Sequence, residues 1–182
     1  VPAFRPDKAI NIDKDDFLCA LEMQDLDCEN YLDLKTGEII FKGDDFTLYE
    51  DIDPLNTLKG SASEKTIFIS GASRGIGRAT AIAFAHAGAK AIYIIARSKE
   101  ALEETKNLIK EANPKTLCSS MECDVTNAEQ VKTAIEDCVK QYGGVDVADA
   151  NAGYLDKWNK IGESDINSWW KSWEVNVKGA YH

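Results

Sequence analysis

Three glycines, Gly71, Gly75 and Gly77, follow an apolar run at residues 66–70. A stretch with apolar residues at helical spacing begins among them. A glycine turn lets a phosphate approach the backbone, and the start of a helix offers free N–H groups and the positive end of a dipole. This order of residues predicts a site for the pyrophosphate of a dinucleotide, with a glycine turn that binds no ligand as the alternative.

A second candidate for ligand chemistry lies about 20 residues after the glycine turn, where dinucleotide folds select their cofactor. A carboxylate there would bind the adenosine ribose of NAD, but the sequence has Arg97 and Ser98. A guanidinium can pair with a 2′-phosphate, and Arg74 inside the glycine turn adds a second cation. These residues predict NADP(H) in preference to NAD(H), unless each arginine is only a solvated surface charge.

Four strand–helix repeats are expected to position these residues. Apolar runs predict strands at 66–70, 91–96, 116–123 and 145–150, and helical spacing predicts helices at 75–87, 98–112 and 126–142. Ser98, a capping box at Thr126–Glu129 and Ser164 are predicted to begin the helices that follow strands two, three and four. Alternating strands and helices indicate an α/β fold with a doubly wound parallel sheet, Rossmann-type but partial, in the strand order 3-2-1-4.

The acidic residues divide the chain into two parts. Residues 11–53 hold fourteen acidic and three basic side chains, although the net charge of the whole chain is −10. We therefore expect an acidic extension of unknown role at 1–60, with a β-hairpin at 31–41, and a dinucleotide-binding domain at 61–182 that is incomplete at its C-terminal end. Neither part has the basic patch of a nucleic-acid-binding protein.

Cysteine usage and hydropathy point to a cytoplasmic protein. The five cysteines show no C-x-x-C spacing and only two histidines accompany them, so we predict reduced thiols and no metal site. No apolar run is long enough to span a membrane. The glycine turn has no Gly-Lys-Ser or Gly-Lys-Thr, which disfavours a nucleoside triphosphatase.

Several motifs together resemble a known family. Residues 70–77 are similar to the cofactor signature of the short-chain dehydrogenase/reductase family, and residues 123–125, 149–153 and 173–179 resemble its later motifs in order. The similarity extends over about residues 46–182, and its first part, residues 49–54, is similar to the lead-in of some fungal members. The motifs and the resemblance together imply thirteen cofactor-binding residues. They are Gly71, Ser73, Arg74, Gly75, Ile76, Gly77, Arg97, Ser98, Asp124, Val125, Asn151, Ala152 and Gly153.

The resemblance also assigns roles to single residues. Asp124 would meet the adenine ring, and Asn176 would hold a water in the catalytic proton relay. The alternatives are a helix-capping aspartate and an asparagine that bonds only locally. Ala150 replaces an asparagine of the family pattern, and Asp149 interrupts an apolar strand, which we expect to weaken that strand. Trp169, Trp170 and Trp173 are expected to form a core or dimer stripe.

The implied activity is hydride transfer between NADP(H) and a small-molecule alcohol or carbonyl, by a protein that is a homo-oligomer at full length. The family's catalytic serine and Tyr-x-x-x-Lys lie downstream of the asparagine motif, and this sequence ends six residues after Asn176. Tyr154 and Lys157 are in the wrong context to replace them. We therefore expect the 182 residues alone to be inactive, with a non-catalytic dinucleotide-binding fragment or pseudoenzyme as the alternative function.

Overall fold

A computed structural model describes residues 50–156 and 161–182. Its centre is a four-stranded parallel sheet in the order β3-β2-β1-β4, as the sequence predicts. The strands are β1 (Thr66–Ser70), β2 (Ala91–Ala96), β3 (Leu117–Glu122) and β4 (Val147–Asp149). The hairpin expected at 31–41 lies outside the described residues, which begin with the short helix η2 (Glu50–Ile52).

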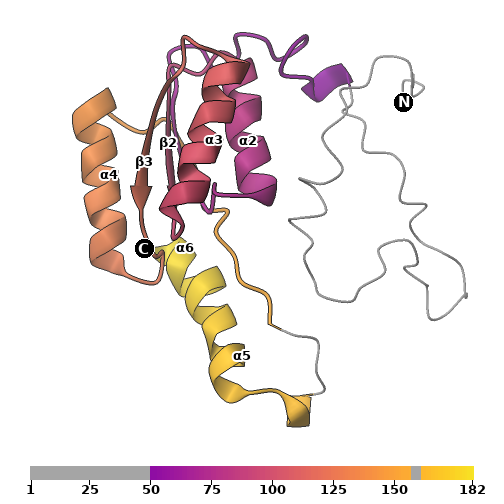
Figure 1. The fold of residues 1–182 in the computed structure, drawn as a ribbon, viewed down its shortest axis with the longest axis vertical. Helices are drawn as coiled ribbons and strands as arrows, with labels where there is room; N and C mark the ends of the chain where they lie inside the picture. Colours follow the sequence, from indigo (N-terminus) through magenta and orange to yellow (C-terminus); the bar gives the residue numbers. More distant parts are fainter. Residues whose placement is uncertain (1–49, 157–160) are drawn as a thin grey trace, which may run out of the picture.

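Helices cover both faces of this sheet. The helices α2 (Gly75–His86) and α3 (Lys99–Ala112) pack side by side on one face, and α4 (Ala128–Tyr142) lies on the other (Figure 1). Side chains of a strand point alternately to the two faces, so Ile67 and Ile69 pack with α2 and α3 while Phe68 packs with α4. Strands β1 and β2 are buried along their whole length, which explains their continuous apolar runs.

The fourth strand is shorter than its apolar run predicts. It pairs with β1 through three residues, from Val147 to Asp149. Asp149 is half-buried there, and removal from water raises the pKa of its carboxyl. The cost of burying a carboxylate agrees with the expectation that Asp149 weakens this strand.

Two of the three predicted helix starts are wrong. Ser98 caps α3 as expected, with its Oγ accepting from the Ala101 N–H at 3.3 Å. Helix α4 is instead capped by Asn127, whose Oδ1 accepts from the two N–H groups at Glu129 and Gln130, because the Thr126 hydroxyl bonds the Asp124 carboxylate.

The C-terminal helix begins one residue later than predicted, because Asp165 rather than Ser164 is its N-cap, accepting from the Ser168 N–H at 2.8 Å. A short turn η3 (Ile161–Glu163) precedes it. The helix comprises α5 (Ile166–Trp173), the π-helical turn η4 (Glu174–Lys178) and α6 (Gly179–Tyr181). Its indoles at Trp169, Trp170 and Trp173 are 41%, 55% and 49% exposed. None of the helices in the described ranges is long and apolar enough to cross a bilayer.

The buried thiols predict how stability depends on pH. Burial raises the pKa of both Cys123 and Cys138 to about 11, with an acidic neighbour of each adding to the rise. In an unfolded chain a thiol has a pKa of about 8.5, so the unfolded state loses its proton first as pH rises. The stabilisation is therefore complete below about pH 8.5 and is lost as pH approaches 11.

We expect the urea midpoint to fall by roughly 1 M or more between about pH 7.5 and about pH 10. Tryptophan fluorescence measures this unfolding, and the variant Cys138→Ala is the comparison. Its midpoint should fall less over the same pH interval. Equal falls in the two proteins would contradict the assignment of this pH dependence to the thiol.

Candidate functional site

A pocket of about 390 Å³ opens at the carboxyl ends of β1, β2 and β3. This is the edge at which parallel α/β sheets bind ligands. Its walls come from the turn after β1, the end of β2, the start of α3, the turn after β3, the loop after β4 and the π turn. The lining residues are Gly71, Ser73, Arg74, Ala96, Arg97, Ser98, Ala101, Cys123, Asp124, Val125, Ala152, Gly153, Tyr154 and Val175.

The glycine turn leaves no room for side chains on the side of β4. Gly71 has φ +69°, and a Cβ on it would lie 2.7 Å from the Ala152 Cα. A Cβ on Gly77 would lie 2.6 Å from the Gly71 carbonyl oxygen and would also meet the Asn151 amide. Gly75 has φ +55°, which L residues rarely adopt. Each glycine is therefore required by geometry, and together they keep bare backbone at the start of α2.

Asn151, in the loop after β4, holds the glycine turn by hydrogen bonds. Its Nδ2 donates to the carbonyl oxygens of Ser70 at 3.0 Å and Gly71 at 3.3 Å. The Ser70 hydroxyl oxygen accepts from the Ala152 N–H at 3.1 Å. Asn151 does not line the pocket, whereas the next two residues, Ala152 and Gly153, do.

Two exposed arginines lie on the pocket wall, as the sequence predicts. Arg74 extends from the glycine turn and Arg97 from the end of β2. Ser98 beside them is committed to capping α3, and its hydroxyl also donates to the Glu100 carboxylate at 3.3 Å. The two arginines therefore make this end of the pocket a candidate binding place for an anion.

Asp124 lines the pocket directly after β3. Its Oδ1 accepts from the Thr126 N–H at 2.9 Å and from the Thr126 hydroxyl at 2.8 Å. The Thr126 N–H contributes most to holding the pKa of the Asp124 carboxyl below its usual range, and the charge of Arg97 adds to the effect. Asp124 is therefore ionised at neutral pH, with one oxygen used to shape the loop.

Asn176 joins the π turn to the loop after β4. Its Oδ1 accepts from the Tyr154 N–H and its Nδ2 donates to the Tyr154 carbonyl, both at 2.8 Å. Asn176 lies outside the pocket lining, whereas its neighbour Val175 is buried against it. π turns inside α-helices are frequent at functional sites. Further along the helix, the His182 Nδ1 lies 2.8 Å from the Val125 carbonyl oxygen.

The structure brings most of the predicted cofactor residues to one pocket. Gly75, Ile76, Gly77 and Asn151 lie outside its lining, and Ile76 is 60% exposed. Sequence reasoning missed the lining residues Ala96, Ala101, Cys123, Tyr154 and Val175. Four of these directly adjoin predicted residues in the sequence, whereas no local signal marked Ala101.

Within residues 50–156 and 161–182, no three His, Cys, Asp or Glu side chains are grouped so that they could hold a metal ion. The three cysteines described, Cys118, Cys123 and Cys138, are free thiols.

The sheet order and the place of the pocket define a doubly wound, Rossmann-type fold. The short chain dehydrogenase family model matches residues 65–182. The chain belongs to the short-chain dehydrogenase/reductase family. It is 40% identical over 120 residues to the short chain dehydrogenase mpl6 of Monascus purpureus, covering 64% of this chain and 41% of that protein.

Two similar solved structures contain NAD. One is an NAD⁺-bound xylitol dehydrogenase, with a TM-score of 0.63 and 30% identity over 66% of this chain and 45% of that one. The other is carveol dehydrogenase from Mycobacterium avium in complex with NAD, with a TM-score of 0.61 and 31% identity over 66% of this chain and 47% of that one. The chain thus spans less than half the length of these relatives.

The close contacts at Gly77 generate a prediction. Gly77→Ala should destabilise the fold by about 1–3 kcal/mol, because the added methyl forces the Gly71 carbonyl and the Asn151 amide apart. Gly144→Ala is the matched control, since a Cβ there meets nothing within 4 Å. Urea unfolding measures both variants. Equal stability of the two would show that the turn accepts a side chain.

Proposed function

We propose that residues 61–182 are a dinucleotide-binding domain that prefers NADP(H), in an oxidoreductase that transfers hydride between NADP(H) and an alcohol or carbonyl. The observation that supports this most is the presence of Arg74 and Arg97 on one pocket wall, where β2 ends without a carboxylate. The NAD in the two similar structures belongs to those proteins. The preference for a 2′-phosphate here rests on the arginines of this chain.

The residues present fit such a cofactor. The bare backbone at Gly71 and Gly77 is a cradle that side chains would fill, and the start of α2 supplies N–H groups for a pyrophosphate. Asp124 and Val125 would lie against the adenine, and Arg74 and Arg97 would receive the 2′-phosphate beside Ser98. Ala152 and Gly153 would line the nicotinamide half. When bound, the nicotinamide supplies or accepts the hydride.

Asn176 has a proposed role in the proton relay. Both polar atoms of its side chain already bond the Tyr154 backbone, so its first effect is to hold the loop after β4 in place. An amide oxygen has two lone pairs, and only one is used by the Tyr154 N–H. The remaining lone pair of Oδ1 is the acceptor with which Asn176 would hold a relay water.

A second candidate function is dinucleotide binding without catalysis by these 182 residues. The observation that favours it is that the pocket is lined by residues assigned to cofactor binding, whereas Asn176, to which a catalytic role is assigned, lies outside the lining. Incubation with NADPH and a panel of ketones and aldehydes separates the two functions. We expect no steady NADPH oxidation by the purified chain, and a rate that survives repurification would overturn this second proposal.

The remaining properties of the whole protein are proposals of the same kind. A small-molecule substrate and a homo-oligomer agree with family membership, and the exposed indoles of α5 offer an apolar face for a second copy. The free thiols agree with a reducing, cytoplasmic location.

The cofactor preference predicts the result of a binding experiment. The protein should bind NADPH about tenfold more tightly than NADH, and Arg97→Asp should reverse this order by replacing an attractive charge with a repulsive one. Quenching of intrinsic tryptophan fluorescence measures both dissociation constants. Lys132→Asp makes the same change of charge on α4, away from the pocket, and should preserve the order.

Two results would contradict the proposal at different levels. Equal affinities for NADPH and NADH in the parent protein would overturn the preference for NADP(H). Binding of neither dinucleotide would overturn the proposed function itself.

A further inference from the structure

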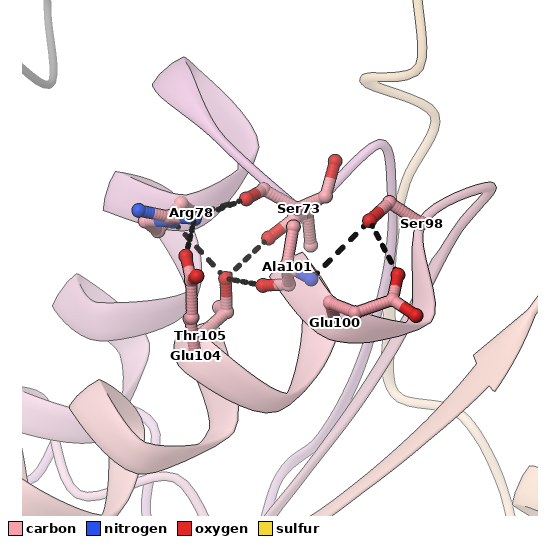
Figure 2. A network of polar contacts seen from close by, with 8 residues as sticks. Ser73, Arg78, Ser98, Glu100, Ala101, Glu104 and Thr105 are labelled. Carbon is pink, nitrogen blue, oxygen red and sulfur yellow. Dashed lines mark hydrogen bonds and ion pairs between the residues drawn. The ribbon is translucent and has the colours of Figure 1, made fainter.

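A third arginine, Arg78, lies in the first turns of α2 and bonds both the glycine turn and α3. Its Nε lies 3.1 Å from both the Ser73 carbonyl oxygen and the Thr105 Oγ1, and its Nη2 pairs with the Glu104 carboxylate at 3.2 Å (Figure 2). Nη2 also donates to the Ser73 carbonyl. The Arg78 side chain is only 15% exposed, so its guanidinium is a fixed part of the interface between α2 and α3.

This network determines the direction in which the carbonyl groups of the glycine turn point. The Thr105 Oγ1, which is fully buried, lies 3.0 Å from the carbonyl oxygens of both Ala72 and Ala101, so two successive carbonyls of the turn, at Ala72 and Ser73, point toward α3. In a planar trans peptide the N–H points opposite to the carbonyl. The N–H groups of Ser73 and Arg74 are therefore directed away from Thr105 and Arg78, and both residues line the pocket.

We infer that Arg78 is a positioning residue that sets selectivity for 2′-phosphorylated dinucleotides; this rests on the proposed function. By holding the Ser73 carbonyl against α3, Arg78 fixes the peptide that precedes the Arg74 Cα. The direction in which the Arg74 side chain leaves the turn is fixed with it. Arg78 thus acts on the phosphate through Arg74, while its own guanidinium stays between the helices.

The two halves of the turn are held by different groups, which is why the effect is selective. Asn151 and the Gly71 backbone hold the first half, which would face the pyrophosphate common to both cofactors. Arg78 and Thr105 hold the second half, which carries Arg74. Loss of Arg78 should therefore loosen the half of the turn that would face the 2′-phosphate, and leave in place the half that would face the pyrophosphate.

The test is the ratio of the dissociation constants for NADPH and NADH in Arg78→Met, which keeps most of the aliphatic stem and removes the guanidinium. We expect the NADPH constant to rise about tenfold and the NADH constant to change by less than about threefold. Lys106→Met is the matched control, because it removes an exposed ion pair with Glu103 at 3.0 Å on the same helix. Its ratio should equal that of the parent.

A conservative variant keeps the inference falsifiable if Arg78→Met does not fold. Arg78→Lys retains the charge but lacks the planar fork that bonds Ser73, Thr105 and Glu104 together. Its preference for NADPH over NADH should therefore be weaker than that of the parent. Where Arg78→Met folds, the ratio of the two dissociation constants for Arg78→Lys should lie between those of the parent and Arg78→Met. A parent ratio retained in a folded Arg78 variant, or equal weakening of both cofactors, would overturn the inference and leave the proposed function standing. Failure of the parent to bind either dinucleotide would instead overturn the proposed function.

Discussion

The site depends on the close approach of two backbones at the ends of β1 and β4. Gly71 and Ala152 come so near to each other that no side chain fits at position 71, and the Asn151 amide closes the contact by bonding two carbonyls of the turn. Strand β4 itself pairs with β1 through only three residues. The contact therefore extends the attachment of β4 to β1 beyond their paired residues. Gly71 both lines the pocket and leaves room for the backbone that follows β4.

The central elements could be predicted from the sequence because their burial is uniform. Strands β1 and β2 are buried on both faces, so each appears as an unbroken apolar run with the bounds that the structure gives. Gly88 follows the end of α2, and Asn113 with Pro114 follows the end of α3. The ends of both helices could therefore be predicted from residues that adjoin them in the sequence. At the edge of the sheet this logic failed: the apolar run predicted a strand over 145–150, but β4 comprises only Val147–Asp149.

The choice among neighbouring polar groups could not be predicted. Thr126 and Asn127 are both good helix caps, and the outcome depended on Asp124, which takes the threonine hydroxyl for its own loop. Arg78 presents a similar problem, because its partners Glu104 and Thr105 come from another helix. Spacing along the chain identifies candidate donors and acceptors, but the partner that each one finds is decided by the packing of α2 on α3.

The π turn at Glu174–Lys178 changes the phase of the C-terminal helix. An α-helix advances by one turn every 3.6 residues, and a π turn inserts an extra residue into one of these turns. The two ends of the helix can then address different surroundings: the indoles of α5 face outward, while Gly179 and His182 meet Val125 beside the pocket. Deletion of one residue from this turn would restore a regular helix and rotate one end relative to the other. One continuous helix therefore carries exposed indoles at its first end and contacts with a pocket-lining residue at its last end.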